Sequence, residues 1–158
     1  MKRLKTKRLL FILYTILLFI FVVLKLYKGV GGVIGDRNHI AKDRLDGYLN
    51  INLIPLKTLK STFDFKNGLN MPNIIGNTVP YIVLGILLSL SEKKFKIIRS
   101  FFICLLMIIS FELIQYITYM GFLDIDDIVL NAFSALFGIL IFYLYKVWQK
   151  SYKEKAYK

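Results

Sequence analysis

The sequence is poor in the residues that build disulfides and metal centres. Among 158 residues it has one cysteine, Cys104, and one histidine, His39. A single cysteine excludes a disulfide within the chain and every motif that needs a cysteine pair. A single histidine excludes a zinc site with several histidine ligands. Covalent catalysis by a Ser–His or Cys–His pair also finds little support in this composition.

Acidic residues are scarce too, with 10 Asp and Glu against 22 Lys and Arg and a formal net charge of +12. A basic balance is common in nucleic-acid-binding proteins, but here the basic residues alternate with long apolar runs. Hydrophobic residues make up 56% of the chain, whereas about 45–50% is usual for a soluble domain. The basic residues therefore indicate the flanks of membrane spans, and we expect no nucleic-acid partner.

Four apolar runs are long enough to cross a bilayer. A spanning helix needs about 20 apolar residues, and continuous runs of this length are not the short alternating strands of a membrane barrel. We therefore predict an all-α fold, an integral membrane four-helix bundle that forms one domain over residues 1–158. A long extracytoplasmic loop, 28–73, with a flexible glycine-rich start, joins the first two helices, and a basic tail covers 146–158. The predicted spans are 9–27, 74–90, 101–123 and 128–145.

The first run also has the basic start of a secretory signal peptide. Its apolar core is longer than the roughly 7–15 residues usual for such a peptide, and the bulky segment 25–28 follows it. We therefore interpret it as a retained anchor helix, in which Lys25 extends its side chain toward the lipid headgroups.

The flanks of the spans predict the orientation. Basic residues cluster in three short segments, with five in 2–8, four in 93–99 and five in 146–158. The connection between the third and fourth spans has none and instead carries Asp124, Asp126 and Asp127. Because short basic flanks stay on the cytoplasmic side, we predict a multi-pass protein of the cell membrane with both termini in the cytoplasm.

Polar residues recur on one face of three spans, and helical geometry places them in the predicted outer half of the membrane. The third span carries Glu112, a costly group at this depth, and no Lys or Arg lies within spans two to four. Packing between helices or capping of the fourth helix explains several of these residues equally well. The predicted binding residues are Asn77, Tyr81, Glu112, Gln115, Asp124, Asp126, Asp127 and Asn131, and Glu112 and the three aspartates are the catalytic candidates.

These residues also carry a family resemblance. The motifs that carry it are Asn52-Leu53-Ile54-Pro55, Gly76-Asn77 with Tyr81, Leu84 and Gly85, and Glu112-Leu113-Ile114-Gln115 with Asp124-Ile125-Asp126-Asp127, Asn131 and Gly138. With these motifs, the segment from about residue 50 to 145 resembles VanZ-like proteins, a family named for a teicoplanin-resistance accessory protein. The resemblance implies a bacterial cell-envelope protein, and some members lower susceptibility to teicoplanin-type lipoglycopeptides.

The chain departs from the family pattern in three places. A proline common in the second span is replaced by Val83, with Pro80 one turn earlier, and paired glycines are replaced by Ser134 and Ala135. The arginine common just before the aspartates is absent, and Gly121 or a neighbour occupies its place. The chain then either lacks this cation or recruits Arg37 or Arg44 from the first loop.

Three functions remain open. We favour an envelope accessory protein that needs no metal or cofactor and sits in the lipid bilayer. Its outer pocket binds a lipid-linked envelope precursor, a lipoglycopeptide or a partner membrane protein, and self-association is left open. The first alternative is an intramembrane enzyme for lipid headgroups or envelope precursors, in which Glu112 and the aspartates hold a hard cation such as Mg²⁺. The second alternative is a small transporter with Glu112 as its titrating group.

Overall fold

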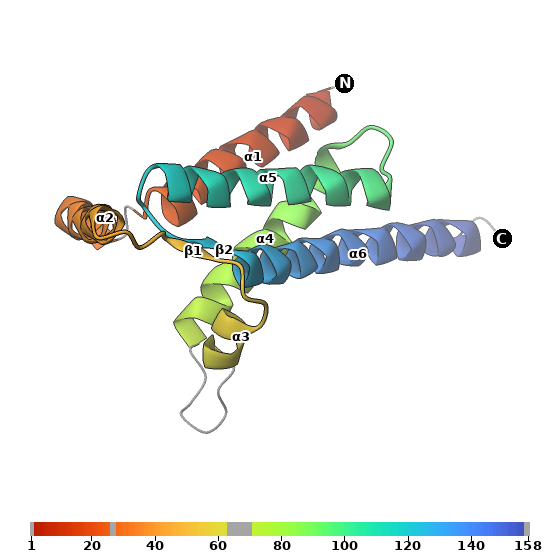
Figure 1. The fold of residues 1–158 in the computed structure, drawn as a ribbon. Coiled ribbons are helices and arrows are strands. Elements are labelled where there is room, and N and C mark those ends of the chain that lie inside the picture. Colours follow the sequence, from red (N-terminus) through yellow and green to blue (C-terminus); the bar gives the residue numbers. More distant parts are fainter. Residues whose placement is uncertain (1, 26–27, 63–70, 157–158) are drawn as a thin grey trace.

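The computed structural model describes residues 2–25, 28–62 and 71–156. These residues are mostly helical, and a single pair of two-residue parallel strands, β1 (Ile51–Asn52) and β2 (Leu123–Asp124), joins two distant parts of the described chain. The helices are α1 (Lys2–Leu18) with its π-helical continuation η1 (Phe19–Val23), α2 (Gly29–Leu45), α3 (Lys57–Thr62), α4 (Met71–Ser91), α5 (Ile97–Ile117) and α6 (Ile125–Ala156) (Figure 1).

Within the described residues, four helices are long and apolar enough to cross a membrane. They cover Leu4–Val23, Ile74–Ser91, Ile97–Ile117 and Ile125–Glu154. The chain is therefore a helical multi-pass membrane protein, and the predicted all-α fold with four spans is confirmed.

Two of the predicted span ends differ from the structure because left-handed turns end the helices early. The first helix ends at Val23, after which Lys25 adopts φ 51°, and the predicted end at residues 26–27 lies outside the described part. The third helix ends at Ile117, because Tyr119 adopts φ 62° and the Met120 N–H turns back to the Gln115 carbonyl at 2.9 Å. The predicted basic tail is mostly helix, since α6 continues without a break to Ala156.

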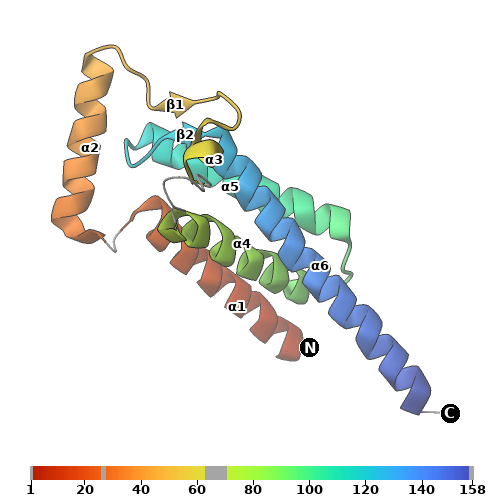
Figure 2. The ribbon, with the colours of Figure 1, turned by 90° about the horizontal axis from the view of Figure 1, so that it is seen from below.

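The two ends of the bundle differ in what they carry. Both chain termini and the α4–α5 connection lie at one end, which we call the terminal end, whereas α2, α3 and the β1–β2 pair lie at the other, the strand end (Figures 1 and 2). All three short basic segments of the sequence are therefore at the terminal end. This agrees with the predicted placement of both termini on one side of the membrane; that this side is the cytoplasm stays a prediction.

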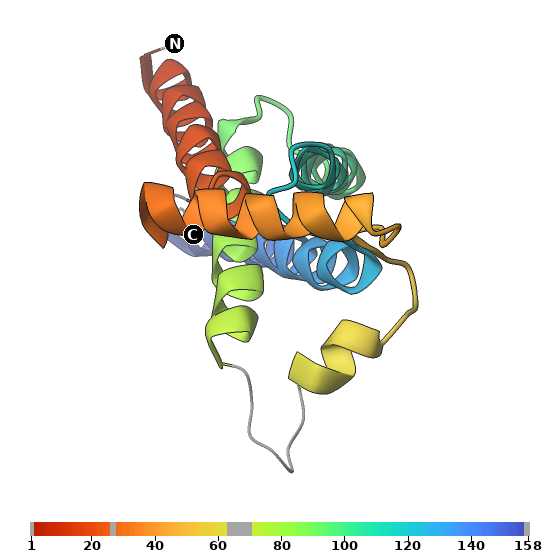
Figure 3. The same ribbon diagram turned by 60° about the vertical axis from the view of Figure 1, so that its left-hand side comes forward.

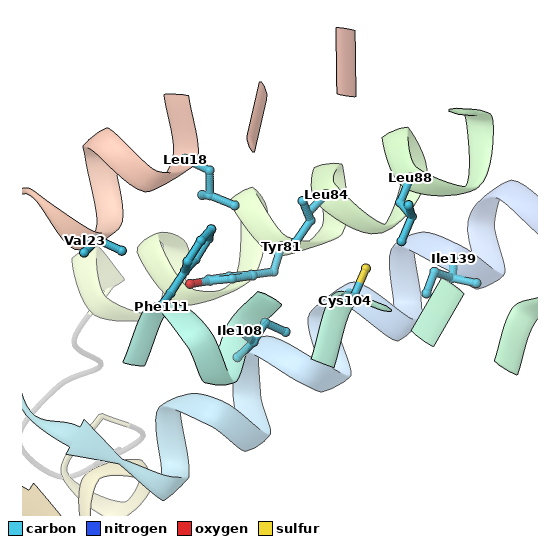
Figure 4. Packing of buried hydrophobic residues seen from close by; sticks show 10 residues of the cluster. Leu18, Val23, Tyr81, Leu84, Leu88, Cys104, Ile108, Phe111 and Ile139 are labelled. Atoms are coloured by element: carbon cyan, nitrogen blue, oxygen red, sulfur yellow. The ribbon is translucent and has the colours of Figure 1, made fainter. Parts of the chain in front are cut away.

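Glycine allows α4 and α6 to pack with their backbones in contact. A Cβ on Gly85 would lie 2.2 Å from the Ala135 carbonyl oxygen, and a Cβ on Gly138 would lie 2.1 Å from that of Ile82. Small residues permit such close approach in membranes, where lipid provides no hydrophobic force between helices. The apolar core continues beside this contact, with Leu84 and Leu88 of α4, Cys104 and Ile108 of α5 and Ile139 of α6 in one buried cluster (Figure 4).

The segment predicted as a long loop contains α2, which lies across the strand end of the bundle (Figure 3). Its buried residue is Ile40, 6% exposed. Arg44 attaches the end of α2 to α5, since its guanidinium donates to the Tyr116 carbonyl at 3.0 Å and lies over the rings of Tyr116 and Tyr119 at 4.2 and 4.4 Å. The glycines at the start of α2 are helical rather than a flexible linker.

Candidate functional site

A cavity of about 1110 Å³ opens at the strand end of the bundle. Its volume is slightly above the range typical of small-molecule sites, about 300–1,000 Å³. Residues from every part of that end contribute to the wall, so the first loop closes a space that the spans alone would leave open. The lining residues are Phe21, Val22, Lys25, Asp43, Tyr48, Leu49, Ile51, Asn52, Lys57, Thr58, Gly76, Asn77, Glu112, Gln115, Phe122, Asp124 and Asp127.

Asp124 organises one wall of the cavity. One carboxylate oxygen accepts hydrogen bonds from the Asn52 amide at 3.0 Å and from the Thr58 hydroxyl. The other accepts from the Asp126 N–H at 2.9 Å, which caps the start of α6. Asp124 therefore joins β1, α3 and α6, and the capping role considered from the sequence is present.

Asp126 binds the backbone N–H groups at the start of α3. Its carboxylate accepts from the N–H groups of Leu56 at 2.7 Å, Thr58 at 2.8 Å and Leu59 at 3.2 Å, at the start of α3. These are donors that a helix start leaves without partners inside the helix. Asp126 thus fixes α3 to α6 and is not among the residues that line the cavity.

Glu112 lies inside the cavity wall and is only 3% exposed. Among the described residues no hydrogen-bond partner exists for its Oε2. The charges of Asp127, Asp124 and Lys25 act on this carboxyl. It lies five residues before the end of α5, about 8 Å below that end at the helical rise. Glu112 is thus shallower than the predicted span 101–123 suggested.

Asp127 is the second carboxylate that faces the cavity from the bundle. Its Oδ1 accepts from the Asn77 amide at 3.0 Å, which joins the first turn of α6 to α4. A partly buried carboxylate with a side-chain amide partner keeps further lone pairs for a ligand. Asn77, Glu112 and Asp127 together bring α4, α5 and α6 to one place.

Lys25 supplies a cation that the sequence interpretation placed among the lipid headgroups. It lines the cavity, and its Nζ lies 3.1 Å from where a Cβ on Gly121 would stand. Burial and the neighbouring Lys28 lower the pKa of Lys25, against the opposing charges of Asp36, Glu112 and Asp127. The left-handed turn at Lys25 directs this side chain inward, and the missing side chain at Gly121 leaves room for it.

Of the remaining predicted residues, one stabilises the cavity wall and two are buried in the helix bundle. Gln115 lines the cavity and donates to the Val22 carbonyl at 2.8 Å, which fixes the end of η1. Tyr81 and Asn131 are almost fully buried and do not line the cavity. Five of the eight predicted binding residues therefore reach the cavity: Asn77, Glu112, Gln115, Asp124 and Asp127.

Sequence reasoning missed Asn50, which fixes the rim of the cavity. Its amide donates to the Gly121 carbonyl, and its Oδ1 accepts from Arg44 at 2.6 Å. Its own carbonyl accepts from the Leu123 N–H at 2.9 Å, next to the β1–β2 pair. Arg44 thus supports the site through Asn50 and Tyr116, while Arg37 is exposed. Of the two arginines considered from the sequence, neither supplies the cation beside Glu112.

Backbone strain is concentrated at this end of the molecule. In the described part of the chain, the residues other than glycine with positive φ are Lys25, Leu56 and Tyr119, at 51°, 67° and 62°. Lys25 lines the cavity, Leu56 donates to Asp126, and Tyr119 lies under Arg44. Such conformations cost about 1–3 kcal/mol each and are enriched at functional sites.

The carboxylates do not form a metal site among the described residues. No group of three His, Cys, Asp or Glu side chains lies close enough there to share a cation. Asp124 and Asp126 instead face the donors already described. The Mg²⁺ arrangement considered from the sequence therefore has no geometric support in the described part.

Fold and site together define a class, a multi-pass helical membrane protein with a polar cavity at one end of its bundle. The sequence profile of the VanZ/LLP1 family matches residues 11–146, and the chain belongs to this family. It is also similar to Protein VanZ of Enterococcus faecium, with 29% identity over 73 residues. That match spans 46% of this chain and 45% of the curated relative. No solved structure shows a significant match.

Proposed function

We propose that this VanZ-family protein is a cell-envelope accessory protein whose cavity binds a lipid-linked envelope precursor or a lipoglycopeptide. Binding there lowers susceptibility to teicoplanin-type antibiotics. The observation that carries this proposal is Glu112, a buried carboxylate with an unpartnered oxygen in the wall of a cavity of about 1110 Å³. A buried acceptor oxygen without a hydrogen-bond donor is costly, so a ligand that supplies the donor gains binding energy.

The predicted orientation places this cavity at the outer surface. The basic segments at the terminal end favour the cytoplasm, which leaves the strand end on the outer side, where an added glycopeptide arrives. A ligand at that surface reaches the cavity without crossing the membrane.

The test removes charge from the cavity without changing side-chain size. We expect Glu112→Gln and Asp127→Asn to lower the teicoplanin inhibitory concentration to that of cells without the protein, because both remove a carboxylate that faces the ligand. Glu154→Gln is the matched control, since Glu154 lies at the opposite end of α6 and is exposed.

Membrane accumulation of each variant is measured by immunoblot, and thermal unfolding is measured in detergent. Wild-type susceptibility in cells that accumulate both Glu112→Gln and Asp127→Asn would show that this cavity does not act on the antibiotic.

A further inference from the structure

Some buried side-chain oxygen atoms without a hydrogen-bond partner belong to residues that line the cavity. Among the described residues these include Glu112 Oε2 and Asn52 Oδ1. The orientation of the Asn52 amide follows from chemistry, because its other atom contacts the Asp124 carboxylate, which can only accept a hydrogen bond. Asn52 Oδ1 is therefore the atom left without a donor.

The two oxygen atoms come from different elements, Glu112 from α5 and Asn52 from β1. A ligand that satisfies both must bring more than one N–H or O–H donor.

The cavity wall also carries both signs of charge. Lys25 and Lys57 line it together with four acidic residues, Asp43, Glu112, Asp124 and Asp127. A purely anionic ligand would meet the carboxylates, which outnumber the ammonium groups, and a purely cationic ligand would leave the two ammonium groups without a counter-charge. A ligand that carries a cation and an anion a few atoms apart can pair with both.

Apolar side chains complete the wall toward the lipid. Phe21 and Phe122 line the cavity and are 55% and 52% exposed. Phe21 lies in η1, inside the first membrane span. A ligand held in the cavity can therefore extend an acyl chain past Phe21 into the bilayer.

We propose that the cavity binds the headgroup of an aminophospholipid, with its primary ammonium at Glu112 Oε2 and Asn52 Oδ1 and its phosphate between Lys25 and Lys57. This inference goes beyond the proposed function, because it assigns a membrane lipid to the same cavity in addition to the envelope precursor or lipoglycopeptide proposed above. The three N–H donors of a primary ammonium match the unpartnered oxygens, and its charge matches Glu112.

The experiment compares three lipids with identical acyl chains. Native mass spectrometry of the full chain in detergent measures the affinity for phosphatidylethanolamine, phosphatidylcholine and phosphatidylglycerol. Phosphatidylcholine has the same charges as phosphatidylethanolamine but no N–H donors, and phosphatidylglycerol has no cation. We expect phosphatidylethanolamine to bind about tenfold more tightly than either, as a charge-assisted hydrogen bond predicts.

Variants of cavity residues test whether the lipid preference arises at this cavity. Glu112→Gln is expected to abolish the preference for phosphatidylethanolamine over phosphatidylcholine, and Glu154→Gln to retain it. Lys25→Met is expected to weaken both lipids by a similar factor, because it removes a contact to the phosphate that they share. Soluble phosphoethanolamine, which has the headgroup without acyl chains, is expected to bind at least about tenfold more weakly than the lipid, since burial of apolar chains adds affinity.

Two outcomes would overturn the inference. These are equal affinity of the wild type for phosphatidylethanolamine and phosphatidylcholine, or a preference that survives in folded Glu112→Gln. If soluble phosphoethanolamine bound as tightly as the lipid, the claim that the ligand is a lipid would be overturned. The proposed function is tested separately, by teicoplanin susceptibility. If the Glu112→Gln strain is susceptible to teicoplanin but the wild-type protein shows no preference among the lipids, only the lipid inference is overturned.

Discussion

Lys25 and Glu112 come from helices far apart in the sequence and face the same cavity with opposite charges. Each is expensive to bury alone, and the interaction between them offsets part of that cost. The position of Lys25 depends on two local features, its left-handed backbone and the absence of a side chain at Gly121. A single lysine at the end of a span can therefore serve a site rather than the lipid surface.

The pH dependence of stability tests the environment of Lys25. Burial and Lys28 lower the pKa of Lys25 below its ordinary value of 10.5 in the folded protein. Between the folded pKa and 10.5 the unfolded chain binds more protons, so the free energy of unfolding should rise with pH in this window. Thermal unfolding in detergent should show the wild type gaining stability relative to Lys25→Met as the pH rises toward 10.5.

The control for this experiment is Lys94→Met, which removes an exposed ammonium on the α4–α5 connection. We expect it to leave the pH profile unchanged. A stability difference between wild type and Lys25→Met that stays constant up to pH 10.5 would contradict the buried position of Lys25.

At the scale of the elements, the contact between α4 and α6 holds the site together. Asn77 and Asp127 lie near one end of this pair, and Gly85 and Gly138 lie further along it. Because each glycine meets a backbone carbonyl of the facing helix, the two helices cannot separate at one glycine without disturbing the other. The distance between Asn77 and Asp127 therefore depends on packing several turns away.

Gly138→Val tests this dependence. The new Cβ would lie 2.1 Å from the Ile82 carbonyl, so the helices must move apart, and we expect a loss of about 1–3 kcal/mol of stability or more. Thermal unfolding and monodispersity in detergent measure it. Gly31→Ala is the control, because Gly31 lies in α2 with nothing within 4 Å of a new Cβ and alanine favours a helix. Equal stability of Gly138→Val and wild type would refute the close contact.

The four spans could be predicted because each long apolar run by itself identifies a helix in lipid. The end of α5 could not, since residues 118–123 are also largely apolar and the helix stops there through the conformation of Tyr119. Helix α2 was missed for a different reason. Its sequence starts with glycines, and its docked position depends on Ile40 and on Arg44 stacked upon residues more than 70 positions away.

The part of the candidate site that lies on the spans could be predicted, because the spans themselves could be. Periodicity brought Asn77, Glu112, Gln115 and Asp127 to one region, because regular helices preserve spacing. It could not show which way Asp126 turns, or that Lys25 points inward, since both depend on contacts with segments outside their own helix. The family resemblance points to a missing arginine at Gly121 or a neighbour, and this is a signal in the sequence for a cation supplied from elsewhere.

At the scale of the whole molecule, the strand end and the terminal end must face opposite sides of the membrane. Cys104 is fully buried, so we expect the wild-type chain to react little with thiol-labelling reagents. We expect Gly31→Cys, exposed on α2, to react with a membrane-impermeant maleimide in intact cells. Lys94→Cys, on the α4–α5 connection, should react only after the membrane is permeabilised. The reverse pattern would invert the predicted topology and place the cavity in the cytoplasm.

The uninterrupted length of α6 has a mechanical consequence. Its 32 residues measure about 48 Å as a helix, more than the hydrocarbon thickness of roughly 30 Å. Asp127 lies in its first turn, and the stacked rings of Trp148 and Tyr152 lie near its other end. A stiff rod pivots as one body, so a tilt imposed at Asp127 displaces these two rings, which lie about 32 and 38 Å away along the helix. A movement of α6 at the cavity is therefore transmitted to its exposed C-terminal end at the other end of the bundle.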